Sequence, residues 1–529
     1  MKQEMEKRKG GRIEESDEEK WVHDASVDYK GRIPLRASTG VWKASLFVLA
    51  IEFSERIAHF GISSNLIMYL TEVMHEDLKT ATNNANLWKG ATTLLPMIGG
   101  FLGDAYTGRF RMVVFSSLVY FKGLSLLTMS QFIPNLKPCN NDICHQPRKV
   151  HEVVFFLALY CIALGTGGFK PCLESFGGDQ FDGDNLEERK KKMSFFNWWT
   201  FTFSIALLLA TTVVVYVQDF VSWGVAYLIL AMFMALTIIA FYVGIPFYRF
   251  LDKAAIVEEK YIEKKAGPWR LATVTRVEET KLILNVVPIW LTSLMIGVCI
   301  AQGSTLFVKQ AAAMNLKISD NFKIPPASMA SLSAFSTIIS VPIYDRIIVP
   351  ILRKVRGNER GISILGRIGI GLIFLVILMV VAALVENMRL RMPGHETMSV
   401  MWLIPQYLIL GIGNSFYLIA LQEYFYDEVP DSMRSVGMAL YLSVIGIGFF
   451  LSSFLIIIVD HVTGKNGKGW IAKDVNSSRL DKFYWMLAVI SALNLCLFLF
   501  LAKRFTYKTA RRKATEIDCS NCDGVDTVA

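Results

Sequence analysis

Long apolar segments alternate with short polar segments along most of the chain. The runs at 153–164, 223–245 and 364–385 reach or approach the roughly 20 residues that cross a bilayer as an α-helix. Glycine and proline inside such runs are tolerated, because neighbouring helices can satisfy the freed backbone groups. The pattern therefore predicts about twelve membrane-spanning helices.

The predicted spans fall into two sets of six, separated by a charged segment. The first set lies at about 41–70, 84–103, 112–132, 153–176, 195–217 and 223–248. The second set lies at about 282–310, 325–347, 365–385, 400–424, 435–459 and 483–501. We expect an all-α, multi-pass integral membrane protein built from two six-helix bundles, the plan of a pseudo-symmetric carrier with its site between the halves.

The polar segments complete the predicted domain plan. It consists of an N-terminal tail at 1–40, a first bundle at 41–248, a linker at 249–280, a second bundle at 281–502 and a C-terminal tail at 503–529. Lysine and arginine gather in the linker and in the loops on its side of the alternation, and positively charged loops stay in the cytosol. We expect both termini on the cytosolic side.

Composition supports a membrane location. Of 529 residues, 53% are hydrophobic and only 19% are charged, against roughly 25% charged in an ordinary soluble domain. The net charge of +9 could attract nucleic acid, but the cations lie in loops between apolar spans. We expect a lipid bilayer as partner and no nucleic acid. The sequence does not choose between the plasma membrane and a vacuolar or other endomembrane, nor does it indicate an oligomeric state.

Four ionisable residues interrupt the first span: Glu52, Glu55, Arg56 and His59. A charge at the centre of a membrane helix costs roughly 2.5–3.5 kcal/mol on insertion scales, so such residues usually line a pathway. At about 100° per residue, the four lie within about 100° of arc on one helical face. Arg56 can stabilise one carboxylate and leave the other to carry a proton. The alternative is a static ion-pair cluster that orders the bundle.

Two lysines also lie at membrane depth. Lys170 follows Gly165, Gly167 and Gly168, which superficially resemble a phosphate-binding loop. Such a loop follows a strand and opens a helix, whereas these glycines continue a membrane helix and permit close packing. We therefore exclude nucleotide binding and expect no enzyme activity, no metal and no cofactor. Lys122, in the third span, either snorkels or lines the cavity.

Several motifs of the chain are typical of one transporter family. They are Glu52-Phe53-Ser54-Glu55-Arg56, Gly99-Gly100-Phe101-Leu102-Gly103-Asp104 with Gly108-Arg109, Lys170-Pro171, Gly178-Asp179-Gln180-Phe181, and Trp402-Leu403-Ile404-Pro405-Gln406-Tyr407. Over nearly its whole length the sequence resembles the plant nitrate and peptide transporter family, relatives of the proton-dependent oligopeptide transporters in the major facilitator superfamily. The first motif is the ExxER signature of that family.

The resemblance implies alternating access in a two-bundle carrier. It places Glu52, Glu55 and Arg56 in proton coupling, with the proton as the coupling ion, and Lys170 near the substrate or its carboxylate. Three further residues are candidates for gating: Asp104 and Arg109 of the loop signature, and Glu423 at the cytosolic end of helix ten.

Three departures from the family pattern narrow the range of substrates that the resemblance implies. Asn414 occupies the place where many relatives have an acid that pairs with the helix-four lysine. Ile300 stands before Ala301-Gln302, where nitrate-binding relatives have a histidine, so nitrate binding by that route is disfavoured. His59 replaces an aromatic residue of peptide-transporting relatives, which puts ordinary peptide transport in doubt. His59 is either a hydrogen-bonded wall residue or a proton relay.

We therefore expect a proton-coupled symporter of a small polar, anionic or amino-acid-derived metabolite. The candidate substrate contacts are Lys170, Asn414, Gln302, His59 and Trp199. Two alternatives remain open: an uncoupled facilitator of the same substrate class, and a substrate sensor. The expected partners are the small-molecule substrate, protons and the lipid bilayer.

Overall fold

A computed structural model describes most of the chain. The described residues are 21–22, 26–138, 148–182, 185–251, 274–319, 322–356, 362–392, 398–429, 434–464 and 469–505. Most of the two predicted tails and of the predicted linker lies outside these residues.

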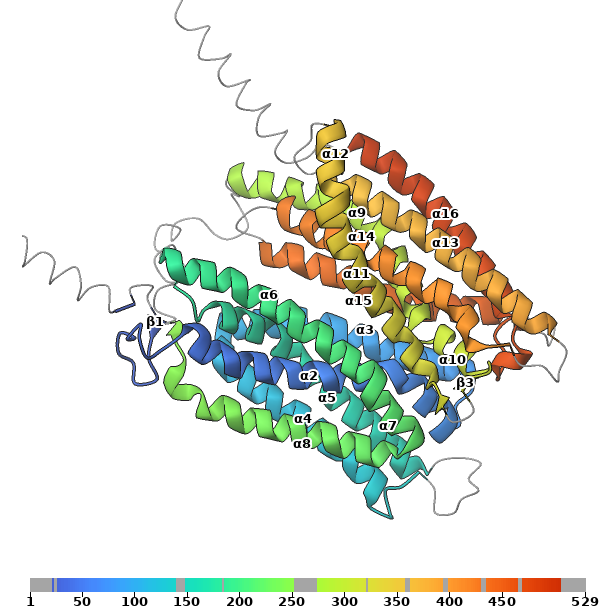
Figure 1. The fold of residues 1–529 in the computed structure, drawn as a ribbon, viewed down its shortest axis with the longest axis horizontal. Coiled ribbons are helices and arrows are strands. Elements are labelled where there is room, and N and C mark those ends of the chain that lie inside the picture. The colour runs from blue at the N-terminus through green and yellow to red at the C-terminus, as the bar shows by residue number, and fades with distance from the viewer. Residues whose placement is uncertain are drawn as a thin grey trace, which may run out of the picture. The chain divides into compact units, whose positions relative to one another are not determined.

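Helices make up almost all of the first half of the described chain (Figure 1). They are α2 (Val41–Met68), α3 (Leu78–Leu102), α4 (Arg109–Phe132), α5 (Lys149–Gly178), α6 (Leu186–Leu209), α7 (Val215–Phe220) and α8 (Trp223–Val243). Short helical turns extend or link them: η1 (Tyr69–Val73), η2 (Gly103–Thr107), η3 (Ala210–Val214) and η4 (Ile245–Phe247).

The second half repeats this helical pattern. Its helices are α9 (Val274–Gly303), α10 (Leu306–Ala312), α11 (Ser331–Ile343), α12 (Val349–Arg356), α13 (Ile364–Arg391), α14 (Ile404–Asp427), α15 (Arg434–Thr463) and α16 (Leu480–Arg504). The helical turns are η7 (Pro326–Ala330), η8 (Tyr344–Ile348), η9 (Val400–Leu403) and η12 (Val475–Ser477). A short antiparallel pair, β3 (Lys317–Ser319) with β4 (Phe322–Lys323), has an irregular register.

Ten helical segments of the described chain are long and apolar enough to cross a membrane. Two long helices, α2 and α3, fall short because they are more polar. The α2 helix carries Lys43, Glu52, Glu55 and Arg56, and the first half of α3 contains three asparagines and two lysines. With α2 and α3, the described chain has twelve candidate membrane helices, the number that the apolar pattern predicts. The expected all-α membrane fold is confirmed.

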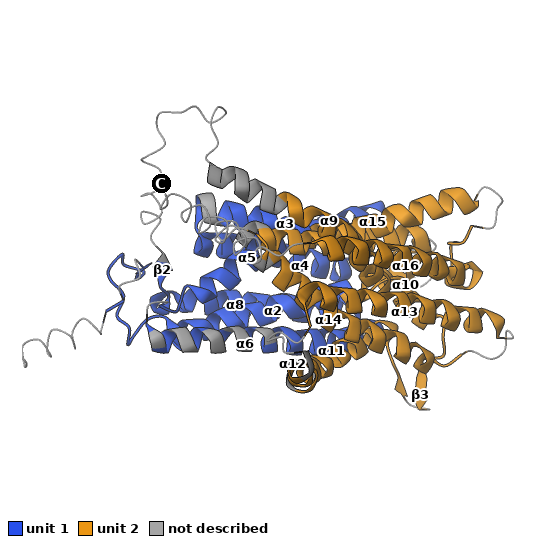
Figure 2. Cartoon of the chain, turned by 90° about the horizontal axis from the view of Figure 1, so that it is seen from above, with its two compact units in different colours: residues 1–63, 94–265 blue, residues 64–93, 266–529 orange. Residues whose placement is uncertain are grey.

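Contacts divide the chain into two compact units (Figure 2). Unit 1 consists of residues 1–63 and 94–265, and unit 2 of residues 64–93 and 266–529. Both unit boundaries near the N-terminus fall inside helices, one within α2 and one within α3. The hairpin formed by the end of α2 and the start of α3, residues 64–93, therefore belongs to unit 2.

Glycines bring the helices of unit 1 close together. Helix α4 packs against α5 and α8. A Cβ added at Gly165 would lie 2.8 Å from the backbone nitrogen of Tyr120 on α4, and one added at Gly167 would lie 2.9 Å from Leu95 on α3. Because α5 continues through these glycines as a helix, their role is close packing, as the sequence predicts.

Unit 2 packs around buried aromatic and aliphatic side chains. Helix α13 contacts α14 and α16, helix α9 contacts α15, and α11 contacts α14. The ring of Phe307 meets the ring of Tyr407 at 6.0 Å and that of Tyr484 at 5.5 Å, both edge to face. These contacts join α10, α14 and α16 in one apolar core.

Residues 26–40, predicted as part of a polar tail, fold onto unit 1. Strand β1 (Ser26–Val27) pairs antiparallel with β2 (Phe250–Leu251). Arg249 is fully buried and bonds both Glu188, at 2.7 Å, and the Thr39 carbonyl, at 3.0 Å. Gly40 has a φ of +69°, and its missing side chain leaves the room that the Arg249 guanidinium occupies. We call residues 26–40 the N-terminal segment.

Candidate functional site

The α2 helix of unit 1 carries a buried group of charges, which we call the α2 charge cluster: Glu52, Glu55 and Arg56. Both glutamates are completely buried, and the Arg56 side chain is 12% exposed. The Arg56 Nε atom donates to Glu52 Oε1 at 2.5 Å and lies 3.7 Å from Glu55 Oε2. The shared helical face that the spacing predicts thus brings the three side chains into contact.

The two glutamates differ in their hydrogen bonds. Glu52 accepts the short bond from Arg56 with one oxygen. Neither carboxylate oxygen of Glu55 accepts a hydrogen bond from any described residue. Glu55 thus lacks the hydrogen bond that Glu52 has, although both carboxylates are completely buried.

Three neighbouring helices complete the surroundings of the cluster. The guanidinium of Arg56 lies over the ring of Phe203, on α6, at 5.4 Å from the ring centroid. Tyr120, on α4, has a fully buried hydroxyl with no hydrogen bond to a described residue, and it interacts electrostatically with Glu55. Lys170, on α5, is half-buried and interacts most strongly with Glu55. The structure thus brings Lys170 into the same group of charges.

Glu174, on α5, is a member of this group that the sequence interpretation missed. It interacts electrostatically with Arg56 and with Glu52. Its side chain is exposed, unlike those of the two α2 glutamates. The signal in the sequence is its spacing of four residues after Lys170, which places both on one face of a membrane helix.

The five charges of this group do not cancel. When all are ionised, Glu52, Glu55 and Glu174 face the two cations Arg56 and Lys170, which leaves one negative charge. Binding one proton would neutralise the group.

Two other candidates of unit 1 are more deeply packed. His59 is buried on α2, with its ring 5.3 Å from that of Phe60. Trp199 is 7% exposed on α6 and packs against Phe195 at 5.8 Å between ring centroids. The ring contacts of both side chains are with aromatic neighbours in the helix core.

The remaining substrate candidates belong to unit 2. Gln302, on α9, is buried and donates to the Ser452 hydroxyl at 2.9 Å. Asn414, on α14, is half-buried, and its side-chain carbonyl accepts a hydrogen bond from the Tyr417 hydroxyl one turn later. Gln302 and Asn414 thus each belong to a separate local network of unit 2.

The gating candidates lie at helix ends. Arg109, at the start of α4, pairs with Asp179 after α5 at 2.6 Å. Glu423, on α14, lies 3.8 Å from Arg367 of α13. Asp104 falls in η2, and its side chain lies outside the described part of the structure. Arg109 thus links two segments of unit 1, and Glu423 links two helices of unit 2.

A second buried lysine, Lys89, was also missed by the sequence interpretation. It lies on α3 within unit 2, is 3% exposed, and donates to the Ser304 carbonyl at 2.9 Å. Asn86, one turn earlier, donates to Ser452 on α15. Hairpin residues 64–93 therefore contact α15, and Ser304 just after α9, through buried polar groups.

Lys122 lies on the outer face of α4. Its side chain is exposed, as are Phe115, Leu118 and Met129, which are spaced along the same face. This stripe of large apolar side chains is the face that lipid would cover. Of the two alternatives for Lys122, its position favours snorkelling along the helix surface.

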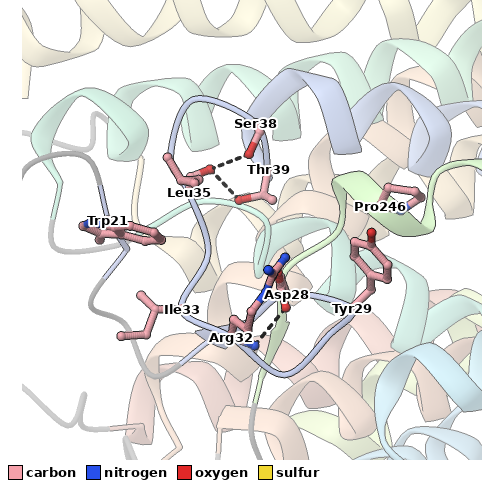
Figure 3. Close-up of a pocket in the computed structure, with 9 residues that line it drawn as sticks. All are labelled: Trp21, Asp28, Tyr29, Arg32, Ile33, Leu35, Ser38, Thr39 and Pro246. Carbon is pink, nitrogen blue, oxygen red and sulfur yellow. Dashed lines mark hydrogen bonds and ion pairs between the residues drawn. The ribbon is translucent and has the colours of Figure 1, made fainter.

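A separate pocket lies beside the N-terminal segment, between Trp21, Tyr29 and Pro246 (Figure 3). Asp28 within it accepts backbone hydrogen bonds from Arg32 and Lys30 and pairs with the Arg32 guanidinium at 3.0 Å. The Arg32 backbone bond, above all, holds the pKa of the Asp28 carboxyl below its usual range. The charges of this pocket are thus already paired.

Comparison with known proteins identifies relatives along almost the whole chain. Residues 110–264 and 248–471 match the family model PTR2, described as the POT family. Protein NRT1/PTR FAMILY 5.7 of Arabidopsis thaliana is 48% identical, over 97% of this chain and 95% of its own. Protein NRT1/PTR FAMILY 5.6 of the same plant is 49% identical, over 94% of this chain and 96% of its own.

Solved structures share the fold. An auto-inhibited POT family peptide transporter matches with a TM-score of 0.72, covering 88% of this chain and 97% of its own at 18% identity. A POT family transporter in complex with 5-aminolevulinic acid matches with a TM-score of 0.65, covering 87% of this chain and 96% of its own at 13% identity.

Proposed function

The chain belongs to the POT family, whose members are membrane transporters rather than enzymes, and from this premise we propose that it is a proton-coupled symporter. Its proposed cargo is a small polar, anionic or amino-acid-derived metabolite, carried by alternating access. No cofactor other than the coupling proton enters this proposal.

One observation carries the proposal. Glu55 is completely buried beside Arg56, yet its carboxylate accepts no hydrogen bond from a described residue. Arg56 is engaged instead by Glu52 at 2.5 Å. In the proposed mechanism Glu55 holds the coupling proton, and Glu52 bonds Arg56 while that proton is bound. When the proton leaves, the Arg56 guanidinium moves from Glu52 toward the Glu55 carboxylate.

We propose further roles for residues outside the α2 charge cluster. Lys170, half-buried and electrostatically coupled to Glu55, is the proposed ligand of a substrate carboxylate. The proposed wall contacts are His59, Trp199, Gln302 and Asn414. The proposed gating residues are Asp104, Arg109 and Glu423.

The proposed orientation places both termini in the cytosol. It follows from the lysine- and arginine-rich loops on that side of the alternation. The proposed membrane is the plasma membrane or a vacuolar or other endomembrane, and a fluorescent fusion separates these locations.

Transport by purified protein in liposomes tests the proposal. 5-Aminolevulinic acid is the first probe, because a solved relative of the same fold binds it; alanyl-alanine and phenylalanine extend the panel. We expect faster uptake of at least one probe when the outside is acidic relative to the lumen, and loss of this stimulation when an ionophore collapses the gradient.

The alternatives give different results in the same liposomes. Equal flux with and without the gradient would identify an uncoupled facilitator and end the symport proposal. A sensor would bind a probe without measurable flux. The side-chain amide of Asn414, bonded to Tyr417, makes the facilitator the more serious alternative, since many relatives have an acid there.

A further inference from the structure

The pocket beside the N-terminal segment has apolar walls, although the chain around it is polar. Its volume is about 470 Å³, within the range of about 300–1,000 Å³ that is common for small-molecule sites. Four large side chains that line it are themselves exposed: Trp21, Tyr29, Ile33 and Leu35 (Figure 3). Exposed apolar side chains gathered around a cavity indicate an apolar ligand or a membrane contact.

A tight turn forms one side of this pocket. The Asp28 carboxylate accepts hydrogen bonds from the backbone N–H groups of Lys30 and Arg32, both at 2.8 Å. Gly31 donates to the Asp28 carbonyl at 3.0 Å and has a φ of +74°, which glycine adopts readily. The exposed side chains of the turn are therefore held in place before any ligand binds, which lowers the entropy cost of binding.

The turn also carries a cation that is available to a ligand. Lys30 is exposed, and its ammonium lies 5.2 Å from the centroid of the Tyr29 ring. Within the described residues Lys30 has no ion pair, whereas Arg32 is paired with Asp28. Apolar walls beside a free positive charge suit a ligand with an apolar body and an anionic head group.

Membrane helices lead directly to this pocket. Its wall residue Pro246 comes three residues after the end of α8 at Val243, and the N-terminal segment ends where α2 begins. Leu46 of α2 and Val243 of α8 are exposed apolar residues, as expected on a face that lipid covers. The rings of Phe47 and Phe247 stack at 5.9 Å and hold these two helix ends together. The apolar walls of the pocket thus continue the lipid-facing surface of the helices.

We propose that the pocket and its turn bind an anionic phospholipid of the adjacent leaflet, with an acyl chain against Ile33 and Leu35 and the phosphate at Lys30. Tryptophan and tyrosine are enriched where proteins meet the lipid head groups, and a lysine near the surface attracts anionic lipids. In the proposed orientation this leaflet is the cytosolic one, which carries the anionic lipids. The inference requires neither proton coupling nor a transported substrate.

Fluorescence quenching in the purified full-length protein tests the inference. The probe is phosphatidylserine with brominated acyl chains, which quench the tryptophans that they contact, and brominated phosphatidylcholine is the zwitterionic comparison. Quenching that is lost in Trp21→Phe measures occupation of the pocket. We expect half-saturation of this quenching at an about fivefold lower content of phosphatidylserine than of phosphatidylcholine, the effect of one lysine near an anionic lipid.

Variants assign the two parts of the site. Lys30→Gln should abolish the preference for phosphatidylserine and Lys30→Arg should keep it, while Ile33→Ser should weaken both lipids. The matched controls are Lys317→Gln and Ile318→Ser in β3, where an exposed cation also stands beside an exposed apolar side chain. Both controls should leave the quenching of Trp21 unchanged.

Three results would overturn the inference. The first is that neither lipid quenches Trp21. The second is that the two lipids quench it equally in the wild type, or that Lys30→Gln retains the preference. The third is that glycerol 3-phosphate, the head group without acyl chains, displaces the lipid at equal concentration, since the apolar walls would then contribute nothing.

Discussion

Arg56 bonds Glu52 at 2.5 Å across one turn of α2, although Glu55 is its immediate neighbour in the sequence. The distance from Arg56 Nε to Glu55 is 3.7 Å, which leaves Glu55 buried with a weaker charge contact. The two glutamates of the same motif thus have different environments. Substituting one or the other is therefore expected to affect transport differently.

Glu55→Gln is expected to separate proton coupling from substrate passage. The amide cannot release a proton, so uptake should no longer respond to an imposed pH gradient. Exchange of labelled for unlabelled substrate at equal pH needs no net proton movement and should continue close to the wild-type rate. Both rates are measured in the same liposomes.

Glu52→Gln is the informative comparison for that prediction. It removes the carboxylate that holds Arg56 and frees the guanidinium to bond Glu55, so exchange as well as gradient-driven uptake should fall. If Glu55→Gln still responds fully to the gradient, the coupling proton is not held by Glu55.

Lys122→Leu is expected to leave transport unchanged. Lys122 lies on the stripe of α4 that carries Phe115, Leu118 and Met129, away from the charged group around α2. Substrate affinity and the pH response of uptake should match the wild type, while Lys170→Leu, at the other membrane lysine, should weaken substrate binding. A loss of affinity in Lys122→Leu would place Lys122 in the pathway after all.

The sequence predicts those features that depend on local spacing. The apolar runs locate the membrane helices, and the positions of Glu52, Glu55 and Arg56 on one face follow from the helical repeat. The glycines around residue 167 pack closely against α3 and α4, because a residue without a side chain lets two helix backbones approach each other. In each case the physical cause lies within a few residues of the chain.

Features that depend on distant contacts were not predictable. Glu174 lies near the end of a span and resembles an ordinary helix-end charge until Arg56 of α2 is placed beside it. The N-terminal segment is polar, yet it is held by Arg249, which is 210 residues from Thr39 in the sequence. Helix α9 begins at Val274, ahead of the apolar run at 282, because backbone hydrogen bonding continues through its polar first turns.

Arg249→Met is expected to destabilise unit 1. The change leaves Glu188, which is 3% exposed, without its closest cation. Removing one partner of a buried ion pair costs about 3–5 kcal/mol, and the remaining Arg36 contact to Glu188 at 3.1 Å should reduce that cost. A clearly lower melting temperature of the purified protein is the measured result.

Arg32→Met provides the control for Arg249→Met. Arg32 pairs with Asp28 in the same N-terminal segment, but its side chain is 67% exposed, and such pairs contribute roughly 0.2–1 kcal/mol. Its melting temperature should stay near that of the wild type. Equal melting temperatures for the two variants would mean that the buried pair does not hold the N-terminal segment.

Lys89→Met is expected to stabilise unit 2. The Lys89 side chain is 3% exposed and bonds the Ser304 carbonyl, with no ion pair to a described carboxylate. An apolar side chain of similar volume removes the cost of burying a charge there. The matched change Lys79→Met, on the same hairpin, breaks a partly exposed ion pair with Asp460 of α15 and should lower the melting temperature slightly. A lower melting temperature for Lys89→Met would instead show that the hydrogen bond from Lys89 to Ser304 supports the hairpin.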